Sequence, residues 1–230
     1  MSLWDAVKPK PEKPHVVWGE DFLELAQTLY ERADYKRAFA KAVRAIEAWP
    51  TNSEAYVVAG DSLRMLTKDD IRYVTELNQD EDTPENYYRA ALLHEPDDEH
   101  RGHILHKLGQ QLARQGYYTE AAAQYEEAVI YMPAWGTAWY FLAYYRSKVN
   151  GELDAVSLVE AFGDPEAVSA AQDDVRWEPW REQVDGLIEE ANKLIEARAN
   201  DAYHKATKAI DRAEASFYAS RRRGSDAYTP

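Results

Sequence analysis

The chain has 230 residues, of which 45% are apolar and 30% charged, and its net charge is −14. This acidity disfavours nucleic-acid binding, which needs basic surface against phosphates. The sequence contains no cysteine, which excludes a disulfide framework, a thiolate nucleophile and a cysteine-ligated metal. No apolar run approaches the roughly 18 residues of a membrane span. We therefore expect a cytoplasmic protein that binds neither nucleic acid nor membrane.

Residues 1–18 are rich in proline and lysine, with three prolines in the stretch "PKPEKP". Proline lacks a backbone donor and biases its predecessor away from helix. This segment is predicted to be an extended tail.

Two later segments, 19–50 and 102–133, align without a gap when Pro50 is placed over Pro133. Both read as two helices joined by a short turn. The matching pairs are Phe22 and Leu105, Leu25 and Leu108, Ala26 and Gly109, Leu29 and Leu112, Tyr35 and Tyr118, Ala38 and Ala121, and Ala45 and Ala128. These positions are interpreted as those that carry packing, so the alignment indicates an internal repeat.

This repeat resembles the tetratricopeptide repeat (TPR), whose pattern combines a large residue, Leu-Gly or Leu-Ala, a tyrosine, small residues and a closing proline. The resemblance implies an all-α, helical-repeat solenoid made of helix–turn–helix units. Small residues at the helix crossing, Gly109 with Ala121 and Ala26 with Ala38, are expected to let the two helices approach closely. Pro133 is expected to end the second helix.

Two further units with departures extend the predicted array over 19–165. One joins residues 53–66 to 83–96, with Thr83 as the expected N-cap and an acidic insert near 67–82 that is expected to be a solvated loop. The other begins at 136–148 and continues at 151–162, where its second helix is expected to pack differently.

Apolar residues spaced by three and four predict one long helix or two within 166–230. A helical solenoid needs a polar terminal cap, and this segment is expected to supply it. A free helix, a partner-binding helix and the seam of a homodimer remain alternatives. Residues 221–230 are expected to be a basic, frayed end.

The sequence contains no motif of nucleotide binding or hydrolysis, and we expect neither an enzyme nor a cofactor. His100, His103 and His106 are spaced by three near a predicted helix start. Ligands at this spacing do not converge as a metal site requires. The three histidines are therefore interpreted as surface or groove residues.

The resemblance also implies a concave groove lined by the first helix of each unit. The implied groove residues are Leu23, Gln27, Tyr30, Val57, Val58, Asp61, Arg64, Met65, His103, His106, Lys107, Gln110, Arg114, Tyr140, Phe141, Tyr144 and Lys148. The apolar members are expected to anchor a peptide or helix of a protein partner, while Arg64, Lys107 and Arg114 hold acidic groups. Alternatively, the chain's own C-terminal helix or N-terminal tail fills the groove.

TPR co-chaperones that bind acidic chaperone tails use a carboxylate clamp of lysine, asparagine and arginine. The matching positions here carry Leu23, Gln27, Val58, His103 and Lys107, which disfavours that role. We predict instead a non-enzymatic interaction module, an adaptor or scaffold. The alternatives are a dedicated chaperone that masks an apolar client segment, and a structural protein that self-assembles through its C-terminal helix.

Overall fold

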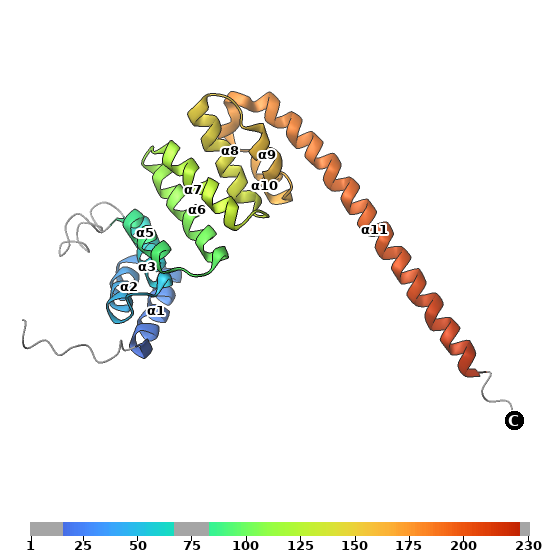
Figure 1. The fold of residues 1–230 in the computed structure, drawn as a ribbon, viewed down its shortest axis with the longest axis horizontal. Coiled ribbons are helices and arrows are strands. Elements are labelled where there is room, and N and C mark those ends of the chain that lie inside the picture. Colours follow the sequence, from blue (N-terminus) through green and yellow to red (C-terminus); the bar gives the residue numbers. More distant parts are fainter. Residues whose placement is uncertain (1–15, 67–82, 226–230) are drawn as a thin grey trace, which may run out of the picture. The chain divides into compact units, whose positions relative to one another are not determined.

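The computed structural model describes residues 16–66 and 83–225, and all of its regular elements are helices (Figure 1). The α-helices are α1 (Val16–Glu31), α2 (Tyr35–Ala48), α3 (Ser53–Met65), α5 (Pro84–His94), α6 (Asp98–Arg114), α7 (Tyr118–Tyr131), α8 (Gly136–Asn150), α9 (Ala155–Ala161), α10 (Pro165–Gln172) and α11 (Arg181–Ser225), with a 3-10 helix η1 (Val175–Trp180). The all-α prediction is confirmed for this part of the chain.

The described residues form two compact units that divide between Leu158 and Val159. In the first unit consecutive helices pack as neighbours, α1 with α2, α3 with α5, and α6 with α7, and each pair also contacts the next. The second unit packs α11 against α10 and η1 around Trp177, which is fully buried. No described helix is long and apolar enough to cross a membrane.

Local signals set the helix boundaries. Side chains of Asn52, Thr83 and Asp97 accept hydrogen bonds from backbone N–H groups in the first turns of α3, α5 and α6, as N-caps do. Thr83 was the N-cap expected from the sequence, and Pro84 follows it as the first helical residue. Proline is well placed there because its missing N–H has no partner in a first turn anyway.

The turns between the paired helices adopt the same backbone geometry in the first and third pairs. Gly116 follows α6 with a φ of +89°, and Ala33, at the equivalent position after α1, has a φ of +60°. Glycine adopts this left-handed conformation freely, whereas alanine does so at a cost. The tertiary packing of α1 on α2 therefore holds the turn at Ala33 in a conformation that alanine disfavours.

Aromatic rings fill the space left by two helical glycines. A Cβ atom on Gly60 would lie 2.9 Å from the ring of Tyr88, and one on Gly109 would lie 2.8 Å from the ring of Tyr125. Tyr88 and Tyr125 occupy equivalent positions of their helices relative to the closing proline. The close neighbour of Gly109 on α7 is thus the Tyr125 ring, while Ala121, the other small residue expected at this crossing, is fully buried.

Several boundaries differ from those expected. Helix α1 already begins at Val16, so the extended tail predicted over 1–18 is wrong for its last three residues, while 1–15 lie outside the described residues. The acidic insert near 67–82 and residues 226–230 also lie outside them. Residues 166–230 contain most of α10, the 3-10 helix η1 and one long helix, α11, which continues to Ser225 through the first part of the expected frayed end.

The predicted fourth unit is shorter than the others. Helix α8 has 15 residues, but α9 after it has only 7, against 14 for α7. Phe162, just after α9, is a large side chain that is only 4% exposed. The helical pairing of the first three pairs does not continue at full length beyond α8.

Candidate functional site

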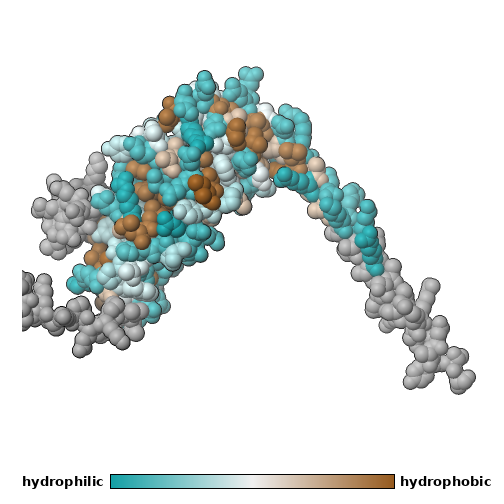
Figure 2. Space-filling model, viewed as in Figure 1, coloured by the Kyte–Doolittle hydropathy of each residue, from teal (hydrophilic) through white to brown (hydrophobic). Residues whose placement is uncertain are grey.

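Two hollows in the first unit are lined by residues of the first helices of the pairs. The larger, with a volume of about 510 Å³, is lined by α3 and α6 and by residues at the ends of α2 and α5; we call it the α3–α6 hollow. The smaller, about 310 Å³, lies between α1 and α3; we call it the α1–α3 hollow. Figure 2 shows the face of the molecule on which apolar and polar side chains alternate in patches.

The structure brings together part of the predicted groove set. Val57, His103 and Lys107 line the α3–α6 hollow. The residues of the predicted set that line the α1–α3 hollow are Gln27, Tyr30, Val58 and Asp61. The four predicted residues on α8 line neither hollow.

Asp61 lines the α1–α3 hollow and is buried, with 7% of its surface exposed. Its Oδ1 accepts a hydrogen bond from the Tyr88 hydroxyl at 2.7 Å, and its Oδ2 accepts one from Lys107 Nζ at 2.7 Å. Arg64 Nη2 lies 3.7 Å from Oδ1. One carboxylate thus joins α3, α5 and α6 and balances Lys107 and Arg64, two of the three cations that were expected to face a partner.

The two tyrosines around Asp61 stay protonated. Burial, reinforced by the charge and hydrogen bond of Asp61, raises the pKa of the Tyr88 hydroxyl well above its ordinary value. Burial and then the charge of Asp61 also raise the pKa of Tyr30. A protonated Tyr88 is required because only the O–H form can donate to the carboxylate.

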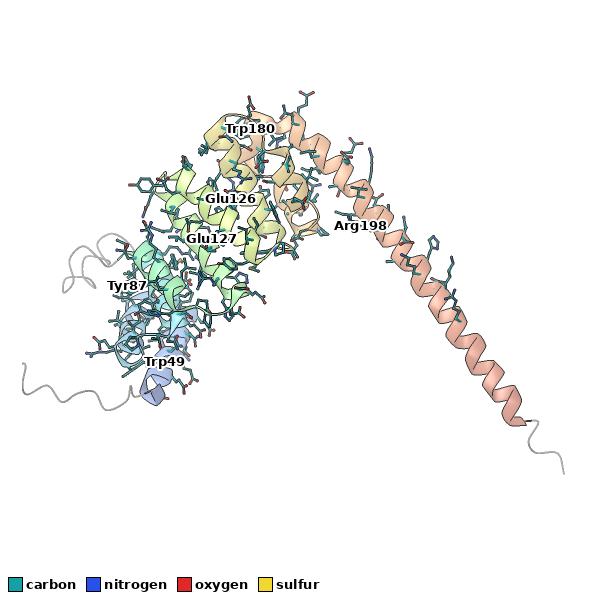
Figure 3. All side chains as sticks on the ribbon, in the orientation of Figure 1. Trp49, Tyr87, Glu126, Glu127, Trp180 and Arg198 are labelled. Atoms are coloured by element: carbon teal, nitrogen blue, oxygen red, sulfur yellow. The ribbon has the colours of Figure 1, made fainter. Side chains whose placement is uncertain are left out.

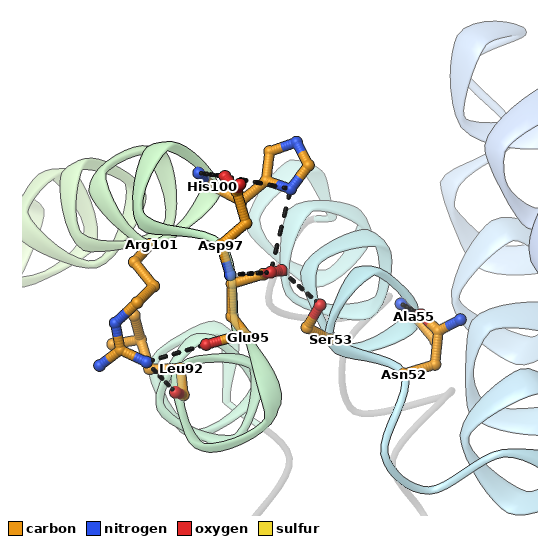
Figure 4. A network of polar contacts seen from close by, with 8 residues as sticks. All are labelled: Asn52, Ser53, Ala55, Leu92, Glu95, Asp97, His100 and Arg101. Carbon is orange, nitrogen blue, oxygen red and sulfur yellow. Dashed lines mark hydrogen bonds and ion pairs between the residues drawn. The ribbon is translucent and has the colours of Figure 1, made fainter. Parts of the chain in front are cut away.

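A second polar network fixes one wall of the α3–α6 hollow (Figure 4). The Glu95 side chain is 8% exposed; its Oε2 accepts from the Ser53 hydroxyl at 2.5 Å and its Oε1 from the Asp97 backbone N–H at 3.0 Å. Arg101 Nη1 donates to the backbone carbonyls of Leu92 and Glu95 at the end of α5. These bonds hold the turn between α5 and α6 against the start of α3.

The three histidines of "HRGHILH" have different surroundings. His100 is 70% exposed, and its Nδ1 lies 3.8 Å from an oxygen of Asp97. His103 is half-buried and packs edge-on against the Trp135 ring, with ring centroids 4.6 Å apart. Among the described residues no three histidine or acidic side chains gather as metal ligands would.

His106 was expected to be a surface or groove residue, and this expectation is wrong because its side chain is buried. Its ring contacts those of Trp135, Tyr125 and Phe141, and the Gln110 amide nitrogen lies 2.7 Å from its Nε2. Burial, and to a lesser degree the positive charges nearby, lower the pKa of His106 to about 4. The imidazole is therefore neutral at neutral pH.

This pKa predicts a stability that falls with acidity. Between pH 7.5 and pH 5 the unfolded chain takes up a proton at position 106 that the folded chain does not. The free energy of unfolding should therefore fall by about 2 kcal/mol from this residue. Urea denaturation across this pH range should show a flatter pH dependence for His106→Leu than for the wild type. His100→Gln, at an exposed position, should keep the wild-type pH dependence; equal slopes for all three proteins would contradict the prediction.

Burial gives several predicted groove residues another role. Leu23 and Val58 belong to the core between α1, α2 and α3, and Tyr140 and Tyr144 are 3% and 8% exposed. The apolar character of these four side chains is therefore explained by packing within the chain, and the expectation that they anchor a partner loses its basis.

The remaining predicted groove residues are accessible to different degrees. Met65, Arg114 and Lys148 are exposed, and Lys148 Nζ lies 4.2 Å from the centroid of the Tyr118 ring. The half-buried members are Gln27, Tyr30, Val57, Arg64, His103, Lys107, Gln110 and Phe141. Phe141 stacks on Tyr125 in an aromatic cluster, away from the two hollows.

Sequence reasoning missed most of the residues that line the α3–α6 hollow, and three of these matter for its chemistry. They are Trp49 (labelled in Figure 3), Glu54 and Glu95. Trp49 and Glu95 each directly precede a proline that closes a second helix. That shared position is the signal that was overlooked, because attention was limited to the first helix of each unit.

The comparisons with known proteins give no family to which the chain can be assigned. No family model matches the sequence, and no curated protein matches it.

Proposed function

We propose that this chain is a non-enzymatic protein–protein interaction module, an adaptor or scaffold, which binds a peptide or helix of a partner along α1, α3 and α6. The observation that carries this proposal is the pair of hollows, each of which is lined in part by α3 and by both apolar and polar side chains. Binding sites for peptides commonly combine apolar anchors with a few fixed polar groups.

We also propose that the first three helical pairs form a TPR-like solenoid. Three features support it: the packing of consecutive pairs, the equivalent glycine–tyrosine contacts of Gly60 and Gly109, and the equivalent turns at Ala33 and Gly116. Solenoids expose an extended concave face, and the inner helices of such an array would be α1, α3 and α6.

The proposal is tested by placing charge on the inner and outer helices in matched variants. Val57→Glu/Met65→Glu alters accessible apolar residues of α3, and Leu93→Glu/Ile130→Glu alters residues of α5 and α7 that are 81% and 72% exposed. Partners captured from a lysate of the native cells, and quantified by mass spectrometry, should be retained by the outer variant and lost from the inner one. Equal capture by both would reject the groove, provided that both variants keep the wild-type thermal unfolding.

Self-assembly through α11 remains a second candidate function. Every side chain that the structure describes between Glu196 and Lys208 is exposed, including Tyr203 at 70%. A helical stretch that no other part of its own unit covers has surface free to pack on another chain. Sedimentation equilibrium of the full chain decides this point, because a monomer at the highest attainable concentration would exclude it.

A further inference from the structure

The α3–α6 hollow offers uncompensated negative charge to whatever occupies it. Two carboxylates line it, those of Glu54 and Glu95, and Glu54 Oε1 accepts a hydrogen bond from the Gln27 side-chain amide at 2.6 Å. The Glu95 carboxylate is held by a hydroxyl and a backbone N–H, with His100 Nδ1 3.9 Å away. No lysine or arginine side chain is paired with either carboxylate among the residues that the structure describes.

The cations near the hollow are already engaged within the chain. Lys107, which lines the hollow, donates to Asp61 at 2.7 Å, and Arg64 is in the same ion-pair group. A bound acidic group would have to compete with a buried carboxylate for Lys107, and it would also face Glu54 and Glu95. The partner with acidic groups that the sequence suggested is therefore disfavoured at this hollow.

The lining also suits a cationic side chain, which consists of an apolar methylene chain and a charged terminal group. Trp49 presents a half-buried indole, and Val57 and Ile104 supply aliphatic surface. Lysine and arginine bury their methylene chains on apolar surface, and their charged groups are attracted to tryptophan faces and to carboxylates. A volume of about 510 Å³ also leaves room for an apolar residue beside the cation.

Helix α1, which contacts α3, and the chain as a whole carry charge of the same sign. Helix α1 carries acidic residues and no lysine or arginine over its 16 residues, and the whole chain has a net charge of −14. The resulting negative potential raises the association rate of a basic partner segment and lowers that of an acidic one.

We propose that the α3–α6 hollow binds an arginine or lysine side chain of a basic partner segment, with the cation between Trp49 and the carboxylates of Glu54 and Glu95. This assignment rests on the proposed function, since it names the chemistry of the partner that the groove receives. It also gives a role to the hydrogen bonds from Ser53 and the Asp97 backbone N–H, which fix the orientation of the Glu95 carboxylate.

The test uses the full chain and a display library of random peptides about twelve residues long, a length that a groove of this kind accommodates. Recovered peptides should carry arginine or lysine beside apolar residues. For one such peptide, fluorescence anisotropy should show a loss of about tenfold or more in affinity with Glu95→Gln, as expected for a desolvated charge pair. Glu54→Gln and Trp49→Leu should each lose several-fold.

Two controls accompany these variants. One shows whether loss of a carboxylate elsewhere on the protein also weakens binding, and the other separates loss of charge from loss of folding stability. Glu127→Gln makes the same chemical change on an exposed position of α7 (labelled in Figure 3) and should bind as the wild type does. If Glu95→Gln lowers thermal stability, Glu54→Gln alone decides the outcome, because its side chain is exposed.

The two proposals fail in different ways. Peptides that are acidic, or that show no charge preference, would overturn the cation assignment while leaving the groove intact. A library from which the wild type retains no more peptide than Val57→Glu/Met65→Glu would overturn the proposed function itself.

Discussion

Replacement of Tyr125 by alanine is expected to lower the free energy of unfolding by about 4 kcal/mol, as deletion of a buried aromatic side chain does. Tyr125 is fully buried, and its ring stacks on those of Phe141 and Tyr145. Removing it leaves a cavity between α6, α7 and α8. Urea denaturation followed by tryptophan fluorescence measures the loss.

Because the Tyr125 ring contacts Gly109, the effect of Gly109→Ala on stability should depend on whether Tyr125 is present. Gly109→Ala gains about 1 kcal/mol of helix propensity, but its methyl group would lie 2.8 Å from the Tyr125 ring, and overpacking costs up to about 3 kcal/mol. The single variant should therefore be less stable than the wild type. In a Tyr125→Ala background the clash is gone, so the same substitution should increase stability.

The first helical pair supports this sign reversal, because it has Ala26 and Ala42 at the equivalent positions and both are fully buried. A double-mutant cycle tests it directly. Additive free energies, or a Gly109→Ala variant that stabilises the wild type, would show that the ring and the glycine are not coupled. Gly186→Ala, where a Cβ would contact nothing within 4 Å, is the matched control for helix propensity.

Asp61→Asn is expected to cost about 3 kcal/mol of folding stability, because it leaves Lys107 and Arg64 without their common carboxylate. Removing one partner of a fully buried ion pair costs about 3–5 kcal/mol. The lower end applies here, since the Lys107 side chain is 31% exposed and can turn partly to water. Thermal and urea denaturation both measure this loss.

The accompanying variants divide this cost among the contacts of Asp61. Tyr88→Phe removes one hydrogen bond to the carboxylate and should cost about 1–2 kcal/mol. Asp98→Asn changes an exposed acid at the start of α6 and should cost less than about 1 kcal/mol, the usual size of a helix-dipole contribution. If Asp61→Asn were no more harmful than Asp98→Asn, Asp61 would not be the centre of a buried network.

The sequence correctly predicted Thr83 as the N-cap of a helix and Gly109 as a small residue where two helices come close. It misjudged burial elsewhere. Leu25, aligned with the buried Leu108, is 42% exposed, because no helix precedes α1 in the described part of the chain to cover it. His106 and Tyr140, assigned to the groove from repeat spacing, are buried among neighbouring aromatic side chains.

The sequence by itself determined the helices, their caps and the pairing of near neighbours, because these depend on side chains within a few residues of one another. Only the tertiary structure decided the charge of the candidate site. The bond between Asp61 and Lys107 joins residues 46 positions apart, and that between Ser53 and Glu95 joins residues 42 apart. These pairings change the expected partner from acidic to basic. Lys107 is already held by the buried Asp61 carboxylate, so it is not available to an acidic partner.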